Sequence, residues 1–437
     1  MEPVARRLLA IGLAAQALYI VLALRYPLRA SLADPRASWL SLNGKDLPWS
    51  FAQIGIYLGL VLLYLAALRL LTRLSGAGSE AGSKPELPPR WVNRLIIAVW
   101  LGCSFVLMTA APAGESHDLF DYVFRGRMMA EFNANPLVAL PKQYNHEAFY
   151  DFIAWHAYVD TYGPLWEIVS KGVATGVRLF TQELGWWIRY VRPCSVSEPT
   201  CRLLIVYVSG YRLMAIGLTG LSAWLITRLV KNSQPEMRSA ALAAWLWNPL
   251  TLIATALGGH NDLWLIALLL AGILLMQRKQ PFWAMMALVL ALHIKLTAFI
   301  WVPAFGLWIL RKWGWRRAAG VGAGSLVCAV AISWLLYAPF GGWISLPRML
   351  YERSLFYAYS IWDVLARLLT LFGVPWSIVY RVNVNLSTFL FLAGILSVAL
   401  WSLNFLPQRW KRPPFDLEQR HFWMMLAATS AVYLVLG

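Results

Sequence analysis

The residues best suited to chemistry lie in one polar stretch, Glu115 to Trp166, which directly follows an apolar run over Leu95 to Pro112. Its first thirteen residues combine carboxylates, a histidine and two arginines: Glu115, His117, Asp118, Asp121, Arg125 and Arg127. Carboxylates are costly beside hydrocarbon, so a group of them at the end of an apolar helix indicates a functional site. Acids and histidines transfer protons and arginines hold phosphates, so this composition predicts a site that does both.

The composition places most of the chain in a lipid bilayer. Of its 437 residues, 59% are hydrophobic and 14% charged, whereas a soluble domain averages about 25% charged residues. Apolar runs lie at 8–25, 51–72, 93–112, 203–227, 239–257, 262–277, 318–338, 384–405 and 421–437. Two shorter runs, 282–292 and 296–310, are typical of a broken helix pair. The pattern predicts an all-α polytopic membrane protein with about 10–12 spans or half-spans and external interfacial helices.

The net charge of +17 indicates membrane topology, and we expect no nucleic-acid partner. The basic residues gather in short loops between apolar runs, and such loops face the cytoplasm. The outer segments are then 27–50, 113–163, the turn at 258–262, the break near 293–295, and 339–375. Nearly all unusual polar motifs fall on that side. We therefore expect a multi-pass protein of the cell membrane whose active site faces the extracytoplasmic side.

The same patterns divide the chain into four parts. Residues 1–73 are expected to form a two-span hairpin, and the segment 74–91, rich in Gly, Ser and Pro, a cytoplasmic linker. A catalytic membrane core follows at 92–338, with its large external loop at 113–163. Residues 339–437 are expected to hold an external interfacial segment and C-terminal spans. Because the last apolar run ends without a polar flank, we expect the sequence to be part of a longer protein.

One apolar segment, 164–180, is interpreted as a helix lying at the external interface. It carries three charged residues: Glu167, Lys171 and Arg178. Each charge would cost roughly 2–3 kcal/mol at the bilayer centre. The run at 203–227 then crosses alone to the basic loop at 228–238. This topology puts Cys194 and Cys201 outside, where a disulfide and free thiols are equally open.

Three further motifs carry polar residues at the ends of apolar runs. TYGPLW contains Tyr162, which could contact substrate or simply anchor the interface. The Gly and Asn residues of GGHND are typical of a turn. A turn does not require His260 and Asp262 in particular, so these two are candidates to line the site. Lys295, in ALHIKLTAF, lies between runs too short to span separately. A broken helix there would turn the lysine toward a cavity and an anion such as a lipid phosphate, although snorkelling to the interface remains open.

The sequence offers no obvious nucleotide-binding motif. The glycine string GVGAG at 320–324 lies inside an apolar run and indicates close helix packing. No Walker motif and no Asp-x-Asp element occurs, so a nucleotide-activated donor has no obvious site. We expect no cofactor. A divalent ion held by Asp118, Asp121 and His117 is an alternative that we do not favour.

The order of these motifs resembles that of a known family. An apolar span is followed by SHDLFDYVFRGRMMAEFNANPLVALP, TYGPLW, WNPLTLIATALGGHND and LHIKLTAFIWVPAF. This order is similar to that of the multispanning GT-C glycosyltransferases, most closely the bacterial polyprenyl-phosphate-mannose-dependent mannosyltransferases. The similarity covers about residues 93–310. The N-terminal hairpin departs from the family pattern, because it places the acidic loop after the third span instead of the first.

The resemblance implies a lipid-linked sugar donor, a reaction at the external face and an acid in the first large external loop as catalytic base. By position that acid is Asp118. We predict inverting transfer of a hexose, with mannose as the first candidate, from a polyprenyl phosphate to a lipid or glycan acceptor. Candidates to hold the departing phosphate are Arg125, Arg127, Lys295 and His260. Candidates for substrate contacts are His117, Asp121, Tyr162 and Asp262. The alternative is a lipid or sugar transporter or flippase without transferase chemistry.

Overall fold

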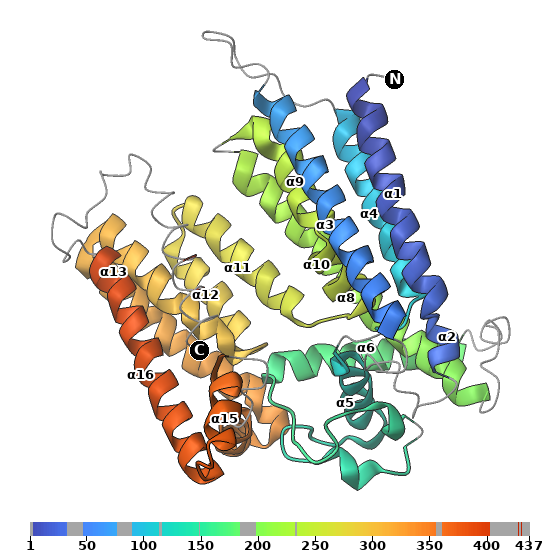
Figure 1. The fold of residues 1–437 in the computed structure, drawn as a ribbon. Helices are drawn as coiled ribbons and strands as arrows, with labels where there is room; N and C mark the ends of the chain where they lie inside the picture. Colours follow the sequence, from blue (N-terminus) through green and yellow to red (C-terminus); the bar gives the residue numbers. More distant parts are fainter. Residues whose placement is uncertain are drawn as a thin grey trace. The chain divides into compact units, whose positions relative to one another are not determined.

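The computed structural model describes residues 3–32, 47–76, 90–112, 116–147, 149–183, 198–231, 234–354 and 361–402, together with Ala427 and Ser430. Helices account for most of them (Figure 1). No strand occurs in these ranges, where the one β-type pairing is an isolated bridge between Pro27 and Ala110. The all-α fold predicted from the apolar runs is confirmed.

The helices pack into two compact units. Unit 1 comprises Met1–Val159 and Trp166–Leu274, and unit 2 comprises Asp160–Leu165 and Leu275–Gly437. These units reflect which segments of the chain lie close together in space, whereas the sequence-based division followed loop charge and linker composition. The functional division with boundaries at 73, 91 and 338 stays a prediction.

Unit 1 is built mainly from long helices. Its α-helices are α1 (Pro3–Arg25), α2 (Leu28–Ser31), α3 (Leu47–Gly76), α4 (Arg90–Met108), α5 (Asp118–Phe132), α6 (Pro164–Glu183), α8 (Glu198–Lys231), α9 (Arg238–Leu246), α10 (Pro249–Leu252) and α11 (Asp262–Gln277). Short 3-10 turns are η2 (Pro141–Tyr144), η3 (Tyr150–Phe152) and η4 (Pro235–Met237), and η5 (Ile253–Leu257) is a π-helical turn. Helices α1, α3, α4 and α9 share one apolar core, so the N-terminal hairpin packs in the same unit as the acidic loop.

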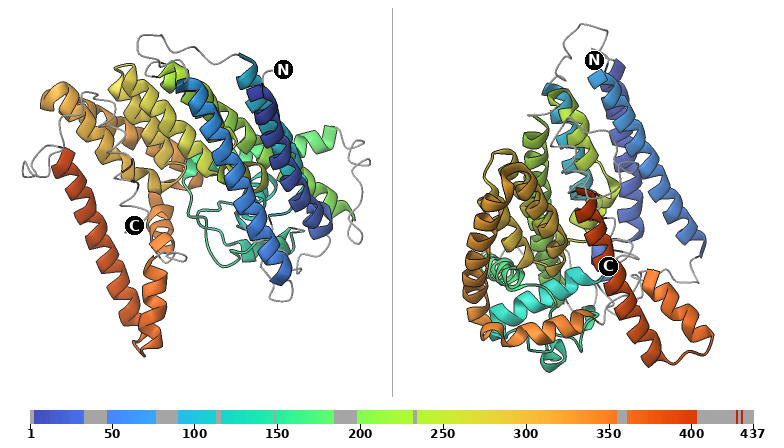
Figure 2. Two further views of the ribbon diagram at one scale, coloured as in Figure 1. Left: turned by 45° about the horizontal axis from the view of Figure 1, so that its top comes forward. Right: turned by 90° about the vertical axis from the view of Figure 1, so that its left-hand side faces the viewer.

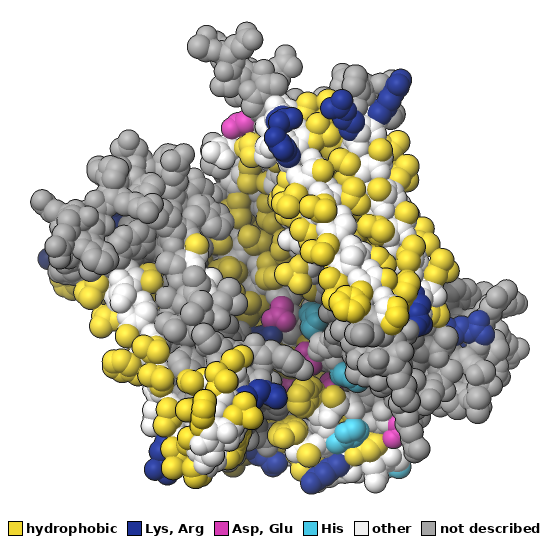
Figure 3. Space-filling model, in the orientation of Figure 1, with side chains coloured by type: hydrophobic (Ala, Val, Ile, Leu, Met, Phe, Trp, Pro, Cys, Tyr) yellow, Lys and Arg dark blue, Asp and Glu magenta, His cyan; other side chains and the backbone are white. Residues whose placement is uncertain are grey.

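The two ends of the unit 1 helices differ in chemistry. Exposed basic residues lie at one end of the helices: Arg6, Arg7, Arg69, Arg73, Arg90, Arg94, Arg228, Lys231 and Arg238. A 2.7 Å hydrogen bond from Ser239 Oγ to Asn93 Oδ1 joins the starts of α9 and α4 at this end. In Figure 3 apolar side chains cover the visible sides of α1 and α3, and Lys and Arg gather at their upper ends. The acid-bearing helix α5 and the GGHND turn lie at the opposite end, which agrees with the predicted polarity.

Five helices in the described ranges are long and apolar enough to cross a membrane: Val4–Arg25, Pro48–Leu74, Arg90–Met108, Arg202–Lys231 and Leu296–Phe340. A sixth span results if Pro235–Leu246 and Pro249–Leu257, which meet at a bend of 50°, count as one. Helix α6 is not among them, and it runs across the direction of α1 and α3 (Figures 1 and 2). This arrangement agrees with α6 as an interfacial helix.

Unit 2 contains the predicted broken helix. Its elements are α12 (Pro281–Leu292), η6 (Leu296–Trp301), α13 (Val302–Tyr337), η7 (Ala338–Phe340), η8 (Gly342–Ser345), α14 (Leu346–Ser354), α15 (Ile361–Leu371) and α16 (Trp376–Ser402). Helix α12 ends just before Lys295, and the chain resumes as the 3-10 turn η6. Within α13, Gly314 has φ 78° and ψ 171° and separates the runs predicted at 296–310 and 318–338. Most of the run predicted at 421–437, Cys194 and the side chain of Cys201 lie outside the described residues.

Candidate active site

Asp118 is the first residue of α5 and is half-buried. Its backbone N–H donates to Ser116 Oγ at 3.1 Å, and an acid in a first helical turn suits the helix dipole. Its carboxylate accepts one long hydrogen bond, 3.5 Å from Trp155 Nε1. At that length the bond is weak. The carboxylate therefore retains most of its capacity to accept a proton or a hydrogen bond from a substrate.

The next acid and the first arginine of α5 hold a loop. Asp121 and Arg125 are each 4% exposed. Asp121 Oδ2 accepts a hydrogen bond from the Ala154 N–H at 3.3 Å. Arg125 Nη2 donates to the carbonyl oxygens of Tyr158 at 3.0 Å and Trp155 at 3.4 Å. Together they fasten the loop that carries the indole partner of Asp118. Their roles in substrate and phosphate binding stay predictions.

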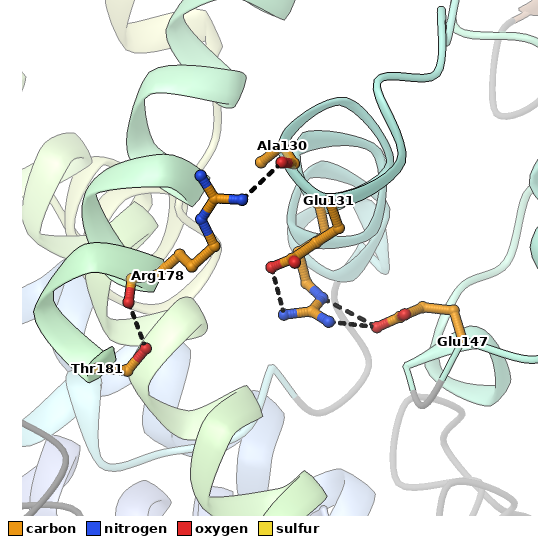
Figure 4. A network of polar contacts seen from close by, with 6 residues as sticks. Ala130, Glu131, Glu147, Arg178 and Thr181 are labelled. Atoms are coloured by element: carbon orange, nitrogen blue, oxygen red, sulfur yellow. Dashed lines mark hydrogen bonds and ion pairs between the residues drawn. The ribbon is translucent and has the colours of Figure 1, made fainter.

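Arg127 pairs with two carboxylates, Glu131 and Glu147, which are labelled in Figure 4. Its guanidinium donates to Glu147 Oε1 from Nε at 2.9 Å and from Nη2 at 2.6 Å. Its Nη1 lies 3.5 Å from Glu131 Oε1. The same group stacks over the rings of Phe149 and Tyr207, at 4.6 and 4.9 Å from the centroids. Two carboxylates balance one cation here, so the geometry favours a structural role, and the predicted phosphate contact is untested.

The GGHND turn lies against the first turn of α5. Gly259 has φ +59°, a conformation that favours glycine. A Cβ at Gly259 would lie 2.8 Å from Leu119 Cδ1, so the turn backbone touches the residue after Asp118. The fully buried Asn261 accepts a 3.3 Å hydrogen bond from the Tyr122 hydroxyl through Oδ1. Two motifs more than a hundred residues apart in sequence thus meet in unit 1.

The remaining polar residues of this turn are partly accessible. His260 is half-buried, and its ring lies close to Gly258, where a Cβ would be 2.7 Å from the imidazole Cδ2. Asp262 is half-buried and begins α11. Both residues thus belong to the segment that packs on α5. Their predicted contacts with phosphate and substrate remain untested.

His117 precedes Asp118 and is half-buried. Its Nδ1 is buried and has no hydrogen-bond partner among the described residues. Burial lowers the pKa of His117 below its ordinary value of 6.5, and a backbone hydrogen bond with Phe152 and the charge of Asp118 act in the opposite direction. The imidazole is therefore neutral near pH 7 and stands beside the candidate base.

We expect His117 to make the folded state sensitive to acid. Its pKa is lower in the folded chain than in the unfolded chain, so the unfolded state binds the extra proton as pH falls below about 6.5. This contribution to stability is intact above that pH and declines toward the lower folded pKa. Thermal unfolding in detergent between pH 7.5 and 5 should show a smaller acid loss for His117→Gln than for wild type. Equal losses would contradict the assignment.

Unit 2 joins two other motifs. Gly163 and Leu165 of TYGPLW donate backbone hydrogen bonds to the carbonyls of Ile294 and His293, each at 2.9 Å. A Cβ on Gly163 would overlap the His293 carbonyl group. Lys295 Nζ lies 5.5 Å from the centre of the Tyr162 ring, within range of a cation–π contact. The predicted residues Tyr162 and Lys295 therefore form one local arrangement.

His293, at the helix break, holds the segment that carries Lys295 in place through two side-chain contacts. Its Nδ1 lies 2.7 Å from the Val289 carbonyl and its Nε2 lies 2.7 Å from Ser333 Oγ. A neutral ring that donates from Nδ1 and accepts at Nε2 satisfies both contacts. The histidine thus ties the end of α12 to α13, and its carbonyl remains available to Leu165.

The prediction missed one buried cation, Arg212. It lies inside the apolar run 203–227 and is 0% exposed. A sequence signal existed, because a lone arginine inside a span is a functional candidate by default. Its hydrogen-bond partners are backbone carbonyls, which no sequence pattern reveals.

No group of three or more His, Cys, Asp or Glu residues that could hold a metal occurs in the ranges that the structure covers. His117, Asp118 and Asp121 therefore do not form a ready-made ligand set. The expectation that transfer needs no metal stays a prediction.

Two family models each match more than half of the chain. One describes the N-terminal domain of alpha-(1->6)-mannopyranosyltransferases and matches residues 9–311. The other describes glycosyltransferase family 87 and matches residues 202–436. The chain belongs to these families of GT-C-like membrane glycosyltransferases. The family resemblance inferred from the motif order is confirmed.

A curated relative agrees with this assignment. The chain is 23% identical over 300 residues to alpha-(1->6)-mannopyranosyltransferase A of Mycobacterium tuberculosis (strain ATCC 25618 / H37Rv). The matched region covers 68% of this chain and 51% of the relative, so the chain spans about half the length of the curated relative it matches. No solved structure matches the chain.

Proposed function

We propose that this membrane glycosyltransferase moves a hexose, with mannose as the first candidate, from a polyprenyl phosphate to a lipid or glycan acceptor. The reaction takes place at the extracytoplasmic face of the cell membrane. Support for the face comes from unit 1, where the basic loops and the acid-bearing helix lie at opposite ends. Support for a lipid-linked donor comes from the sequence, which lacks a Walker motif and an Asp-x-Asp element.

The observation that carries the proposal is the state of Asp118. It is half-buried at the start of α5, its carboxylate accepts one 3.5 Å hydrogen bond, and the GGHND turn packs on the adjacent Leu119. Asp121, by contrast, is buried and accepts a backbone hydrogen bond. Asp118 is therefore the acid that we assign to remove the proton from the acceptor hydroxyl as it attacks the anomeric carbon. One direct displacement of this kind inverts the anomeric configuration.

The leaving polyprenyl phosphate gains negative charge as the glycosidic bond breaks, and fixed cations stabilise such charge. Arg125 and Arg127 donate to loop carbonyls and to glutamates. Lys295 and His260, each named from its own sequence motif, remain our first candidates for the phosphate role. Lys295 is half-buried in a helix break, where a fixed cation is screened less than on an open surface.

The test of this function is to incubate purified protein with polyprenyl-phosphate mannose, the matching glucose and galactose donors, and a membrane extract as acceptor source. We expect a new mannosylated lipid or glycan, formed equally well when EDTA is present. GDP-mannose without lipid should give none. Product from GDP-mannose alone would overturn the proposed donor, and loss of all product with EDTA would overturn the metal-free base.

The family membership speaks against the transporter alternative.

We expect Lys295→Ala to weaken use of the donor. Loss of a charged hydrogen-bond donor facing a phosphate costs about 1.5–3 kcal/mol, which corresponds to a rise in donor KM of roughly 10- to 100-fold. The measurement is transfer rate against donor concentration. Lys295→Arg should keep most of the affinity, and Arg278→Ala, at an exposed site near the end of α11, should match wild type. An unchanged donor KM in Lys295→Ala would remove this residue from the phosphate site.

A further inference from the structure

Arg212 is a charged residue in the middle of an apolar helix. It belongs to the segment Arg202–Lys231, which is long and apolar enough to cross a membrane, and it is fully buried. Within the described part of the chain it forms no ion pair, and its two hydrogen bonds go to main-chain carbonyls. An arginine keeps its charge in such a place, so other groups must stabilise it.

Those groups are the ends of two helical segments. Arg212 Nη1 donates to the carbonyl of Met108 at 2.8 Å, and Nε donates to the carbonyl of Leu257 at 2.9 Å. Met108 is the last residue of α4, and Leu257 is the last residue of the π-helical turn η5. Carbonyls at helix C-termini lack partners inside the helix and carry the negative end of the dipole. One guanidinium therefore caps both ends.

Both capped ends precede motifs of the candidate active site: Leu257 adjoins the GGHND turn, and nine residues separate Met108 from Asp118. That turn also lies on the arginine, since a Cβ at Gly259 would be 3.8 Å from Arg212 Cγ and 2.8 Å from Leu119 Cδ1. Arg212 thus touches the GGHND turn and caps the helix that precedes the acidic segment in the sequence.

We propose that Arg212 is a positioning residue for transfer: its fork of N–H groups sets the spacing between the end of α4 and the GGHND turn, and through them the place of Asp118. The catalytic part of this inference rests on the proposed function. A lysine cannot replace it fully, because an ammonium group lacks the planar fork that bonds two carbonyls in fixed directions.

The kinetic test compares Arg212→Met and Arg212→Lys with Arg228→Met, an exposed position on the same helix. Misplacement of reacting groups by about 1 Å costs on the order of 100-fold. We expect kcat to fall about 100-fold in Arg212→Met and about 10-fold in Arg212→Lys, with donor KM within about threefold of wild type. Arg228→Met should match wild type. A raised donor KM with unchanged kcat, or no change at all, would overturn positioning. If Arg212→Met does not fold, Arg212→Lys decides by the same criteria.

Hydrogen exchange tests the same inference without activity. The amides of Ala110 and Gly258 are bonded to the carbonyls of Leu107 and Ile253, close to the two capped ends. In Arg212→Lys both amides should exchange at least tenfold faster than in wild type, and Arg228→Lys should change neither. Faster exchange at one end alone, or at neither, would overturn the coupling. If wild type shows no transfer, the proposed function fails. The exchange result still decides whether Arg212 links the end of α4 to the end of η5.

Discussion

Asp118→Asn is expected to abolish sugar transfer while leaving the protein folded. A positioned general base contributes about 10²- to 10⁴-fold to a rate, and asparagine keeps the shape but cannot accept the proton. The side chain of Asp118 is half-buried and accepts a single long hydrogen bond, so its replacement should disturb the fold little. The measurement is kcat with a saturating lipid-linked donor, together with thermal unfolding of the purified variant.

Two other acids serve as controls for that result. Asp151→Asn changes an exposed residue of η3 and should keep wild-type turnover. Asp121→Asn should lower stability, because the buried carboxylate accepts the Ala154 N–H, but it should reduce kcat less than Asp118→Asn. Turnover near wild type in Asp118→Asn, or a larger loss of kcat in Asp121→Asn, would show that the base is assigned wrongly.

Gly163→Ala is expected to separate the TYGPLW segment from the helix break. A Cβ at this position would overlap the carbonyl group of His293, which is backbone and cannot rotate away. The hydrogen bonds from Gly163 and Leu165 to Ile294 and His293 should be lost, at a cost of about 1–3 kcal/mol. The contact between Tyr162 and Lys295 depends on this docking, so we also expect a fall in transfer rate of more than tenfold. Thermal unfolding and initial rates provide the two readouts.

Gly172→Ala is the matched control for that substitution. Gly172 lies in α6, and a Cβ there meets no atom within 4 Å. Alanine in a helix interior is favoured over glycine by about 0.5–1 kcal/mol, so this variant should be as stable as wild type or slightly more so. If Gly163→Ala behaves like Gly172→Ala in both assays, the close backbone approach does not matter for stability or transfer.

The sequence predicted the architecture because a bilayer imposes simple rules. Within the described residues the long apolar runs form helices. Helix α6 is not among those apolar enough to cross a membrane, and its place at the interface stays a prediction. The broken helix at Lys295 was visible because its two runs were too short to cross alone. Motif order also indicated the family. These signals are local, since each depends on residues close together in the chain.

The detailed geometry of the site could not be predicted in the same way. Arg125 and Arg127 have the composition of a phosphate site, yet their partners are loop carbonyls and Glu147, which only the folded chain brings near. The contact of Gly259 with Leu119 and the two carbonyls capped by Arg212 are likewise long-range. Every residue has a backbone carbonyl, so the sequence does not show which carbonyl an arginine will bind. The partners of these arginines are therefore known only from the folded structure.

The most direct test of the central claim is a single-turnover experiment with polyprenyl-phosphate mannose labelled in the sugar and an acceptor purified from the membrane extract. We predict one labelled product with inverted anomeric configuration from wild type, and a rate at least about 100-fold lower from Asp118→Asn with donor binding retained. A product with retained configuration, or equal rates from both proteins, would contradict a lipid-linked donor attacked directly with Asp118 as the base.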